Sequence, residues 1–304
     1  MLLTIPPLAN TWARGWPALR MALTCVVVAI VLGGCVIRVA YNQLDWLALW
    51  YVEDYFDLDR AQEEKARALI ARTLTWHRAT QLPRYASLSR ALLKGTEGPV
   101  SEAFIADRYA EVVELWDGLL RRVCPDMASL LQTLSDEQVE ELFARLAEEN
   151  EELEEDYSGV NREERRVKQG EAIIRAFRRF TGRLNPAQEA LIRSETEKSH
   201  DLSSDWLRRR AAWQQEFRIL MNGRKSDPGF EVRFTDLVLN PNQFDSPGYR
   251  EIVQDNQRRF FSLVAEVLGT LSPAQEKHLK DRLETDAKDF DALIRSSEQQ
   301  PRRQ

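Results

Sequence analysis

The sequence has few of the residues and patterns from which catalytic and metal sites are built. Its 304 residues include three histidines, three cysteines and thirteen glycines. His77, His200 and His278 lie far apart, and there is no His-x-x-x-His or Cys-x-x-Cys spacing. A glycine-rich phosphate loop and a Gly-x-Ser-x-Gly turn are also missing. We therefore predict no enzyme activity, no catalytic residue, no metal site and no cofactor.

Trp76-His77, followed by Leu-Pro-Arg-Tyr at 82–85, is the local pattern in which a catalytic site could be hidden. An enzyme would need a deep pocket with clustered titratable groups near His77 and Tyr85. The pattern is more typical of a joint between two helices, in which Pro83 sets the turn and aromatic rings fill it. We adopt that interpretation.

Positive charge is also in short supply, since 42 Lys and Arg face 48 Asp and Glu, a net charge of −6. An acidic protein has no electrostatic reason to hold nucleic acid, so we predict no nucleic-acid partner. Hydrophobic residues make up 43% of the chain, which is ordinary for a folded protein.

The first 35 residues have the order of a secretory signal. Two arginines precede an apolar run over 21–32, and the run ends in a match to the bacterial lipobox, Leu32-Gly33-Gly34-Cys35. The pattern predicts a signal peptide at 1–34 and lipid, including palmitate, on Cys35. Because Val36 rather than Asp follows the cysteine, the usual sorting rule predicts the periplasmic face of the outer membrane.

An uncleaved anchor in the inner membrane is the alternative. No residue from 21 to 37 is charged, but a spanning helix needs roughly 20 apolar residues, and two glycines interrupt this run. We favour the lipoprotein. Cys25 leaves with the signal and Cys35 carries lipid, so Cys124 is left alone and we expect it to be a small buried side chain. The true start of translation stays open, because the region before Met21 is long.

The body of the chain is rich in helix-forming residues. We therefore predict an all-α fold, an array of antiparallel helical hairpins. No convincing alternating strand occurs; Val232 and Phe234 could make a short one at best. The expected helices lie near 42–57, 59–80, 83–94, 100–122, 135–157, 161–183, 185–222, 247–269 and 272–296.

Four expected helices begin with the same pattern, a leucine, a capping residue, two spacers and a glutamine. The capping oxygen accepts amide hydrogens of the first turn, and the glutamine reaches back to the cap amide. The spacing is irregular, so this is no fixed-period solenoid, and duplication followed by divergence would explain it. The four segments are 58–62, 134–138, 184–188 and 271–275.

These features divide the chain into a signal peptide, an aromatic juxtamembrane helix (35–57), a helical body (58–296) and a disordered tail (297–304). Whether the body is one domain or two stays open. Within it, residues 223–246 hold two glycines and two prolines, are followed by Pro247, and are predicted as one long loop. The loop's apolar content predicts that it packs on the body.

Two charge and aromatic clusters each allow two interpretations. An acidic run at 148–156 precedes a basic segment at 162–183, which predicts an antiparallel hairpin with solvated charge pairs rather than a docking or ion site.

The aromatic residues over 41–56 suit a membrane interface, but their acidic neighbours favour packing on the body.

The segment from Leu32 to Tyr85 resembles a family of uncharacterised Gram-negative lipoproteins. The shared features are the lipobox, Arg-Val-Ala-Tyr-Asn at 38–42, Asp-Trp at 45–46, Tyr-Phe-Asp-Leu at 55–58, Gln62, Trp76-His77 and Leu-Pro-Arg-Tyr at 82–85. This resemblance implies a location and no activity. The four helix starts are weakly similar to the Leu-Thr-x-x-Gln motifs of Spy- and CpxP-type periplasmic chaperones, although none has Thr.

We therefore expect a lipid-anchored, non-enzymatic protein that binds envelope proteins in a chaperone-like way. The alternative is a structural adaptor with one defined partner in an envelope assembly. The first predicts a sizeable exposed apolar groove, and the second one saturable interface, such as the 223–246 segment. Partner identity and oligomeric state cannot be read from the residues.

Overall fold

The computed structural model describes residues 35–159 and 161–298, and within them every regular element is helical, as predicted. The elements are α3 (Cys35–Tyr41), α4 (Leu44–Phe56), α5 (Arg60–Thr80), α6 (Leu82–Gly95), α7 (Glu102–Leu131), α8 (Asp136–Ser158), α9 (Arg162–Thr181), α10 (Pro186–Lys198), α11 (Ser203–Asn222), α12 (Phe230–Leu239), the 3-10 turn η1 (Pro241–Phe244), α13 (Pro247–Gly269) and α14 (Pro273–Glu298).

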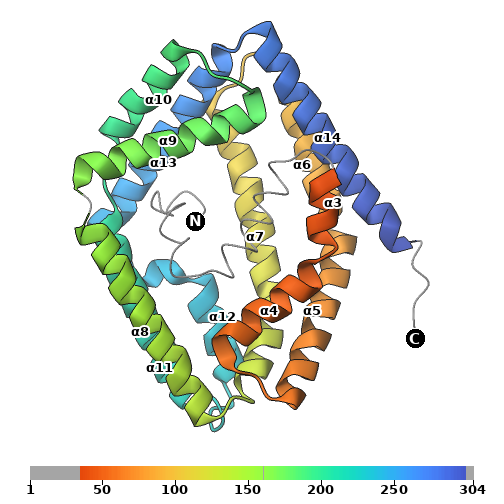
Figure 1. Ribbon diagram of the computed structural model, residues 1–304, viewed down its shortest axis with the longest axis vertical. Helices are drawn as coiled ribbons and strands as arrows, with labels where there is room; N and C mark the ends of the chain where they lie inside the picture. The colour runs from red at the N-terminus through yellow and green to blue at the C-terminus, as the bar shows by residue number, and fades with distance from the viewer. Residues whose placement is uncertain (1–34, 160, 299–304) are drawn as a thin grey trace.

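The helices form an elongated frame (Figure 1). The long helix α7 runs through the frame, and α8 and α11 border one side. α14 packs along α6, α12 packs on α7, and α9 packs on α10. The α4–α5 turn and the α13–α14 turn lie at opposite ends of the long axis.

Each of the four predicted helix starts is present as a capping box. The cap oxygens of Asp59, Ser135 and Asn185 accept the backbone N–H of the glutamine three residues on, and each glutamine accepts the cap amide in return. Ser272 and Gln275 make the same two bonds, at 3.4 and 2.9 Å. Local side-chain chemistry therefore fixes where these helices begin.

The single helix predicted over 185–222 is wrong, because the chain breaks into α10 and α11. At the break Ser199 is extended, and Asp201 accepts hydrogen bonds from the backbone N–H and the hydroxyl of Ser203. Arg165 of α9 binds the same carboxylate at 2.8 Å. Competing side-chain bonds of this kind draw the backbone out of a helix.

The long loop predicted over 223–246 is also wrong, because it contains α12 and η1. Phe230, Phe234 and Leu237 recur at helical spacing and are all buried, so the proposed strand at Val232 and Phe234 is a helix instead. The predicted packing of this segment is confirmed. The glycines and prolines that suggested a loop lie at the ends of these short elements, where they start and stop helices.

α7 continues past the predicted end at 122 and through Pro125 to Leu131. A proline inside a helix costs roughly 3 kcal/mol. Here Cys124, Ala128 and Leu131 are buried against neighbouring helices, so packing outweighs that cost. The predicted character of Cys124 is confirmed: it is a free, buried thiol whose pKa burial raises to about 11.

The predicted hairpin of 148–156 on 162–183 is not formed. α8 packs on α4 and α11, whereas α9 packs on α10 and α14. The acidic residues Glu140 and Glu149 bind Arg218 and Arg210 of α11. Attraction between exposed charges is too weak to choose a partner against apolar packing.

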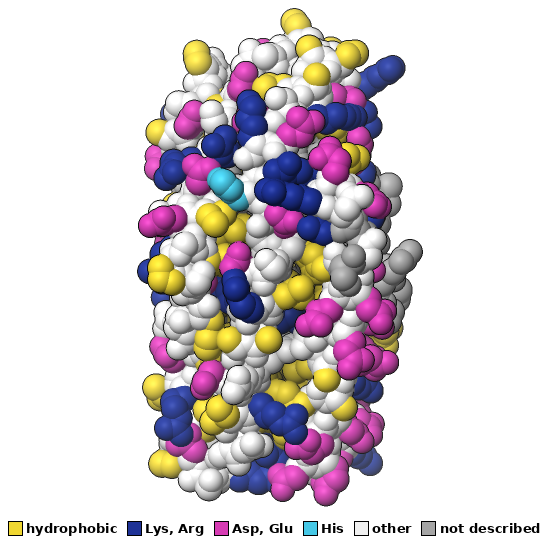
Figure 2. All heavy atoms as spheres, turned by 90° about the vertical axis from the view of Figure 1, so that its left-hand side faces the viewer, with side chains coloured by type: hydrophobic (Ala, Val, Ile, Leu, Met, Phe, Trp, Pro, Cys, Tyr) yellow, Lys and Arg dark blue, Asp and Glu magenta, His cyan; other side chains and the backbone are white. Residues whose placement is uncertain are grey.

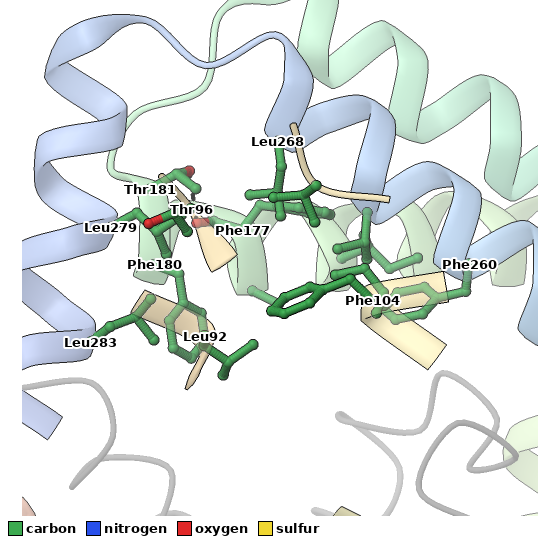
Figure 3. Close-up of a pocket in the computed structure, with 15 residues that line it drawn as sticks. Leu92, Thr96, Phe104, Phe177, Phe180, Thr181, Phe260, Leu268, Leu279 and Leu283 are labelled. Atoms are coloured by element: carbon green, nitrogen blue, oxygen red, sulfur yellow. Dashed lines mark hydrogen bonds between the residues drawn. The ribbon is translucent and has the colours of Figure 1, made fainter. Parts of the chain in front are cut away.

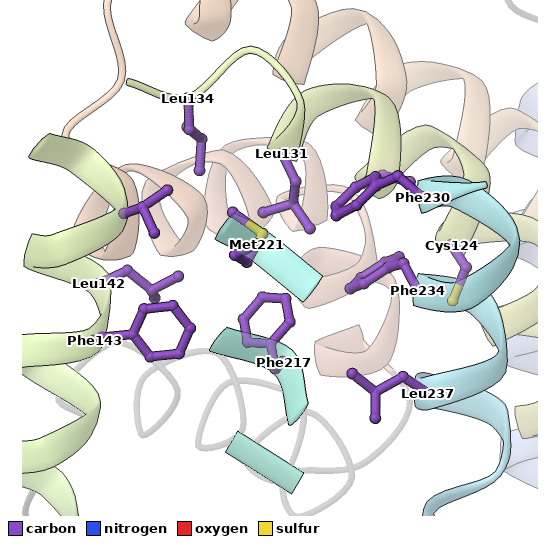
Figure 4. Packing of buried hydrophobic residues seen from close by; sticks show 12 residues of the cluster. Cys124, Leu131, Leu134, Leu142, Phe143, Phe217, Met221, Phe230, Phe234 and Leu237 are labelled. Carbon is purple, nitrogen blue, oxygen red and sulfur yellow. The ribbon is translucent and has the colours of Figure 1, made fainter. Parts of the chain in front are cut away.

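The main core lies between α7, α8, α11 and α12 (Figure 4). Leu131, Leu142, Phe143, Phe217 and Phe230 converge there from these four helices. Arg224, 97% buried, donates from its guanidinium to the Leu134 carbonyl and fixes the end of α11 to the α7–α8 turn.

No helix within the described ranges combines the length and the apolar character that crossing a membrane requires. The predicted signal peptide and the lipobox residues Leu32, Gly33 and Gly34 lie outside the described residues, as does the end of the predicted tail, 299–304. α14 extends to Glu298.

Candidate functional site

The glutamines of the capping boxes pair two by two across the fold. Gln62 and Gln138 exchange amide hydrogen bonds of 3.0 and 2.8 Å. Gln188 and Gln275 do the same at 3.2 and 2.9 Å. Each glutamine thus caps its own helix and binds a helix start that lies far away in the sequence.

The two glutamine pairs share one further rule. Each Nε2 also donates to the carbonyl found five residues before the partner glutamine. The acceptors are the carbonyls of Thr133, Asp57, Thr270 and Arg183, at 2.9, 2.8, 3.1 and 2.9 Å. Four bonds that obey one rule identify two equivalent arrangements rather than four independent caps.

The surrounding helices repeat in the same way. We call α4, α5, α7 and α8 the first unit, and α9, α10, α13 and α14 the second unit. In the first unit α4 packs on α5 and α8, and α5 packs on α7. In the second unit α9 packs on α10 and α14, and α10 packs on α13. The structure therefore contains one four-helix arrangement twice.

The second unit borders an apolar pocket of about 310 Å³. Figure 3 shows side chains of α9, α13 and α14 around it, together with Phe104 of α7 and Leu92 of α6. The lining residues are Leu92, Thr96, Val100, Phe104, Ile105, Ile173, Ala176, Phe177, Phe180, Thr181, Phe260, Val264, Leu268, Leu279 and Leu283.

Five residues that line the pocket stand at positions equivalent to residues that form the main core of the first unit or pack against it. Counted from the glutamine of the following helix, Leu268 matches Leu131, and Val264 matches Met127. Counted from the glutamine of its own helix, Leu279 matches Leu142. By the same counting Leu283 matches Leu146. Thr181 matches Tyr55 when each is counted from the glutamine of the following helix. Every first-unit residue in these pairs belongs to the main core or packs against it, and every second-unit residue lines the pocket.

The two units differ in which side chains fill the space between their helices. In the first unit Phe217, Met221, Phe230 and Phe234 of α11 and α12 occupy the centre. In the second unit α6 and the start of α7 stand opposite and leave space. The Phe104 ring lies so close to Gly95 that a Cβ there would overlap it, so this wall depends on a glycine.

The pocket lining contains no titratable side chain. Charged groups stand only at its border, where Arg282 lies 6.0 Å from the Phe180 ring centre and Arg108 lies 5.6 Å from that of Phe104. Such a site can exclude water and hold apolar groups.

His77 and Tyr85, where we would have sought a catalytic site, lie elsewhere. The His77 imidazole stands between two phenols, with its Nδ1 2.8 Å from Tyr41 Oη and its Nε2 3.3 Å from Tyr85 Oη. Burial lowers the pKa of His77 to about 4 and raises that of Tyr41 to about 12. The cluster joins α3, α5, α6 and α14, as expected for a helix joint.

The other predicted positions do not meet at one place. Cys35 is the first residue of α3. His200 lies beside Asp255, and His278 lies against Gly182 near the second glutamine pair. No group of residues able to hold a metal ion occurs in the part of the chain that the structure describes.

The aromatic residues of α4 follow the predicted packing in part. Tyr55 and Phe56 pack against the main core, whereas Trp46 is 52% exposed. On the side of the molecule formed by α8 to α11, acidic and basic side chains are interspersed, with small groups of apolar side chains between them (Figure 2).

Sequence reasoning missed the pocket itself. Phe177, Phe180 and Phe260 were visible as apolar helix positions, but nothing local shows whether another helix covers them. The usable signal was the register to the glutamines, since Leu268 and Leu131 stand at equal distance from theirs.

Comparisons with known proteins give one match. A model of a family of unknown function, DUF6279, matches residues 54–250, which include the last residues of α4, all of α5 to α12 and the first residues of α13. No curated protein matches the chain, and no solved structure does. The match covers well over half of the sequence, and the chain therefore belongs to the DUF6279 family.

Proposed function

We propose that the protein is a lipid-anchored, non-enzymatic envelope protein that holds apolar helical segments of other envelope proteins in its pocket. The lipobox that ends at Cys35 supports membrane attachment and export. The similarity of the helix starts to Spy- and CpxP-type chaperone motifs agrees with a role in holding partners.

The open counterpart of the main core is the observation that carries this proposal. A wall of Leu268, Leu279 and Phe177 faces space at positions where Leu131, Leu142 and their neighbours face buried phenylalanines. Apolar surface that residues 35–159 and 161–298 leave uncovered commonly marks an interaction site.

The first unit also indicates the form of the occupant. Its core is filled by Phe217 and Met221 on α11 and by Phe230, Phe234 and Leu237 on α12. These side chains recur three or four residues apart, which places them on one face of each helix. By analogy, an amphipathic helix with aromatic anchors at i and i+4 suits the pocket.

A structural adaptor with one defined partner would use the same pocket, so the number of partners separates the two functions. A photoreactive amino acid replaces Leu268 in the full-length protein, and light is applied to living cells. The matched control carries it at Ile219, an exposed apolar position of α11. Cross-linked proteins are identified by mass spectrometry.

Many unrelated envelope proteins trapped through position 268, and few through 219, would support the chaperone-like function. One stoichiometric partner at 268 would establish the adaptor. Equal labelling from both positions would contradict a role for the pocket.

A further inference from the structure

α3, the first described helix, is fixed to the body. Its Tyr41 is 91% buried and lies 2.8 Å from His77 Nδ1, and Arg38 forms an ion pair of 3.2 Å with Asp289 of α14. Arg78 donates to Asn42 at 3.0 Å and lies over the Tyr41 ring. These contacts hold α3 on α5 and α14 from two sides.

The membrane-embedded group would join the chain at this helix under either interpretation of the N-terminus. Lipid on Cys35 would be attached to the first residue of α3, and an uncleaved anchor over 21–37 would end within this helix. No linker separates the attachment point from the docked helix, so the adjacent surface stays beside the bilayer.

That surface carries exposed apolar side chains. Val39 is 62% exposed and stands one helical turn, about 6 Å, from Cys35. Trp46 is 52% exposed, and its ring stacks on that of Trp50, with centroids 6.3 Å apart. Tryptophan favours the boundary between water and lipid, where its ring is buried and its N–H is satisfied.

The charged side chains near Cys35 give no excess of positive charge that would attract anionic lipid, so a headgroup layer without net charge suits this surface. Arg38 is paired with the buried Asp289, and Asp45 accepts the Trp46 backbone N–H at 2.8 Å. We propose that Val39 on α3 and the Trp46–Trp50 pair on α4, which follow soon after Cys35 in the chain, rest on the lipid bilayer and so fix the orientation of the body on the membrane. This inference rests on the membrane attachment proposed above.

The test uses the full-length, lipid-carrying protein in phosphatidylcholine vesicles. Spin labels are attached to Val39→Cys, to Trp46→Cys and, as a control, to Val232→Cys on α12, which is 73% exposed. Cys124 is buried and does not compete for the label. Paramagnetic resonance measures how readily oxygen and a water-soluble nickel complex reach each label.

We expect labels at 39 and 46 to be several-fold less accessible to nickel and more accessible to oxygen than the label at 232. Nickel accessibility equal to that at 232, in protein that floats with the vesicles, would overturn the docked surface alone. Protein that fails to float would overturn membrane attachment as well. Protection only after envelope proteins are added would assign the surface to a protein partner and contradict the proposal.

Discussion

The two units have the same arrangement of helices but differ in whether other helices fill the space at their centre. Each has a reciprocal glutamine pair and the same order of helix contacts. The first is filled by α11 and α12 and locked by the buried Arg224. The second keeps a pocket of about 310 Å³ at the corresponding positions.

This difference shows that the placement of the four helices and the filling of the space between them have different causes. Capping boxes and glutamine pairs set the angles and register of four helices, and they do so equally well around a full or an open centre. What occupies the centre is decided by other helices. Under the proposed function, the open centre of the second unit is where a partner would bind, and the side chains that fill the first unit are a guide to its chemistry.

The largest expected difference between the two units is the loss of stability when equivalent leucines are replaced by alanine. Leu131→Ala removes a 98% buried side chain, and we expect a loss of about 2–5 kcal/mol in unfolding free energy. Leu268→Ala removes a half-buried pocket side chain and is expected to cost about 1 kcal/mol. Urea unfolding measures both. Equal losses would mean that the pocket is closed in solution.

His77, at the far end of α5, has no counterpart in the second unit and reports on the docking of α3. Its folded pKa of about 4 lies below 6.5, so the unfolded chain binds the proton more readily. As pH falls from 6.5 towards 4, His77 should remove up to about 3 kcal/mol of stability. The measure is the pH profile of the stability difference between wild type and His77→Gln. A pH-independent difference would disprove this role.

The glutamine pairs should differ in strength. Gln188 is 98% buried, and Gln188→Ala leaves buried partners unsatisfied, so we expect a loss of about 3 kcal/mol. Gln138 is half-buried and water can replace it, so Gln138→Ala should cost about 1 kcal/mol. Thermal unfolding ranks the two variants. The reverse order would contradict the burial argument.

Added side-chain volume should destabilise the first unit more than the second. Ala128 is 99% buried in the main core, and Ala128→Leu should destabilise by about 1–3 kcal/mol through overpacking. Ala176 borders the pocket, so Ala176→Leu should change stability by less than about 1 kcal/mol while it narrows the site. Circular dichroism during heating gives both values. A destabilised Ala176→Leu protein would mean that the space is already filled.

Much of the fold could be predicted because its causes are local. A capping residue and a glutamine three residues later predict each of four helix starts, and the structure has all four. The capping residues are Asp59, Ser135, Asn185 and Ser272. The errors arose where distant packing decides. α7 passes through Pro125 because its end is buried, and residues 230–239 form α12 because their apolar face meets α7.

The pairing of the glutamines and the pocket were beyond local reasoning. Gln188 and Gln275 look like ordinary helix caps until the fold brings them together. Phe177 reads equally well as a core residue or a pocket residue, since the distinction depends on whether another helix covers it.

The most direct test of the account is a binding titration with the full-length protein in phosphatidylcholine nanodiscs. The ligand is an amphipathic helical peptide with Phe at i and i+4 and Leu at i+7, and a second peptide with Gln at both Phe positions is the control. We predict saturable binding of the Phe peptide that Leu268→Arg abolishes and Ile219→Arg leaves intact. Binding that is equal for both peptides, or unaffected by Leu268→Arg, would contradict the pocket as the open counterpart of the core.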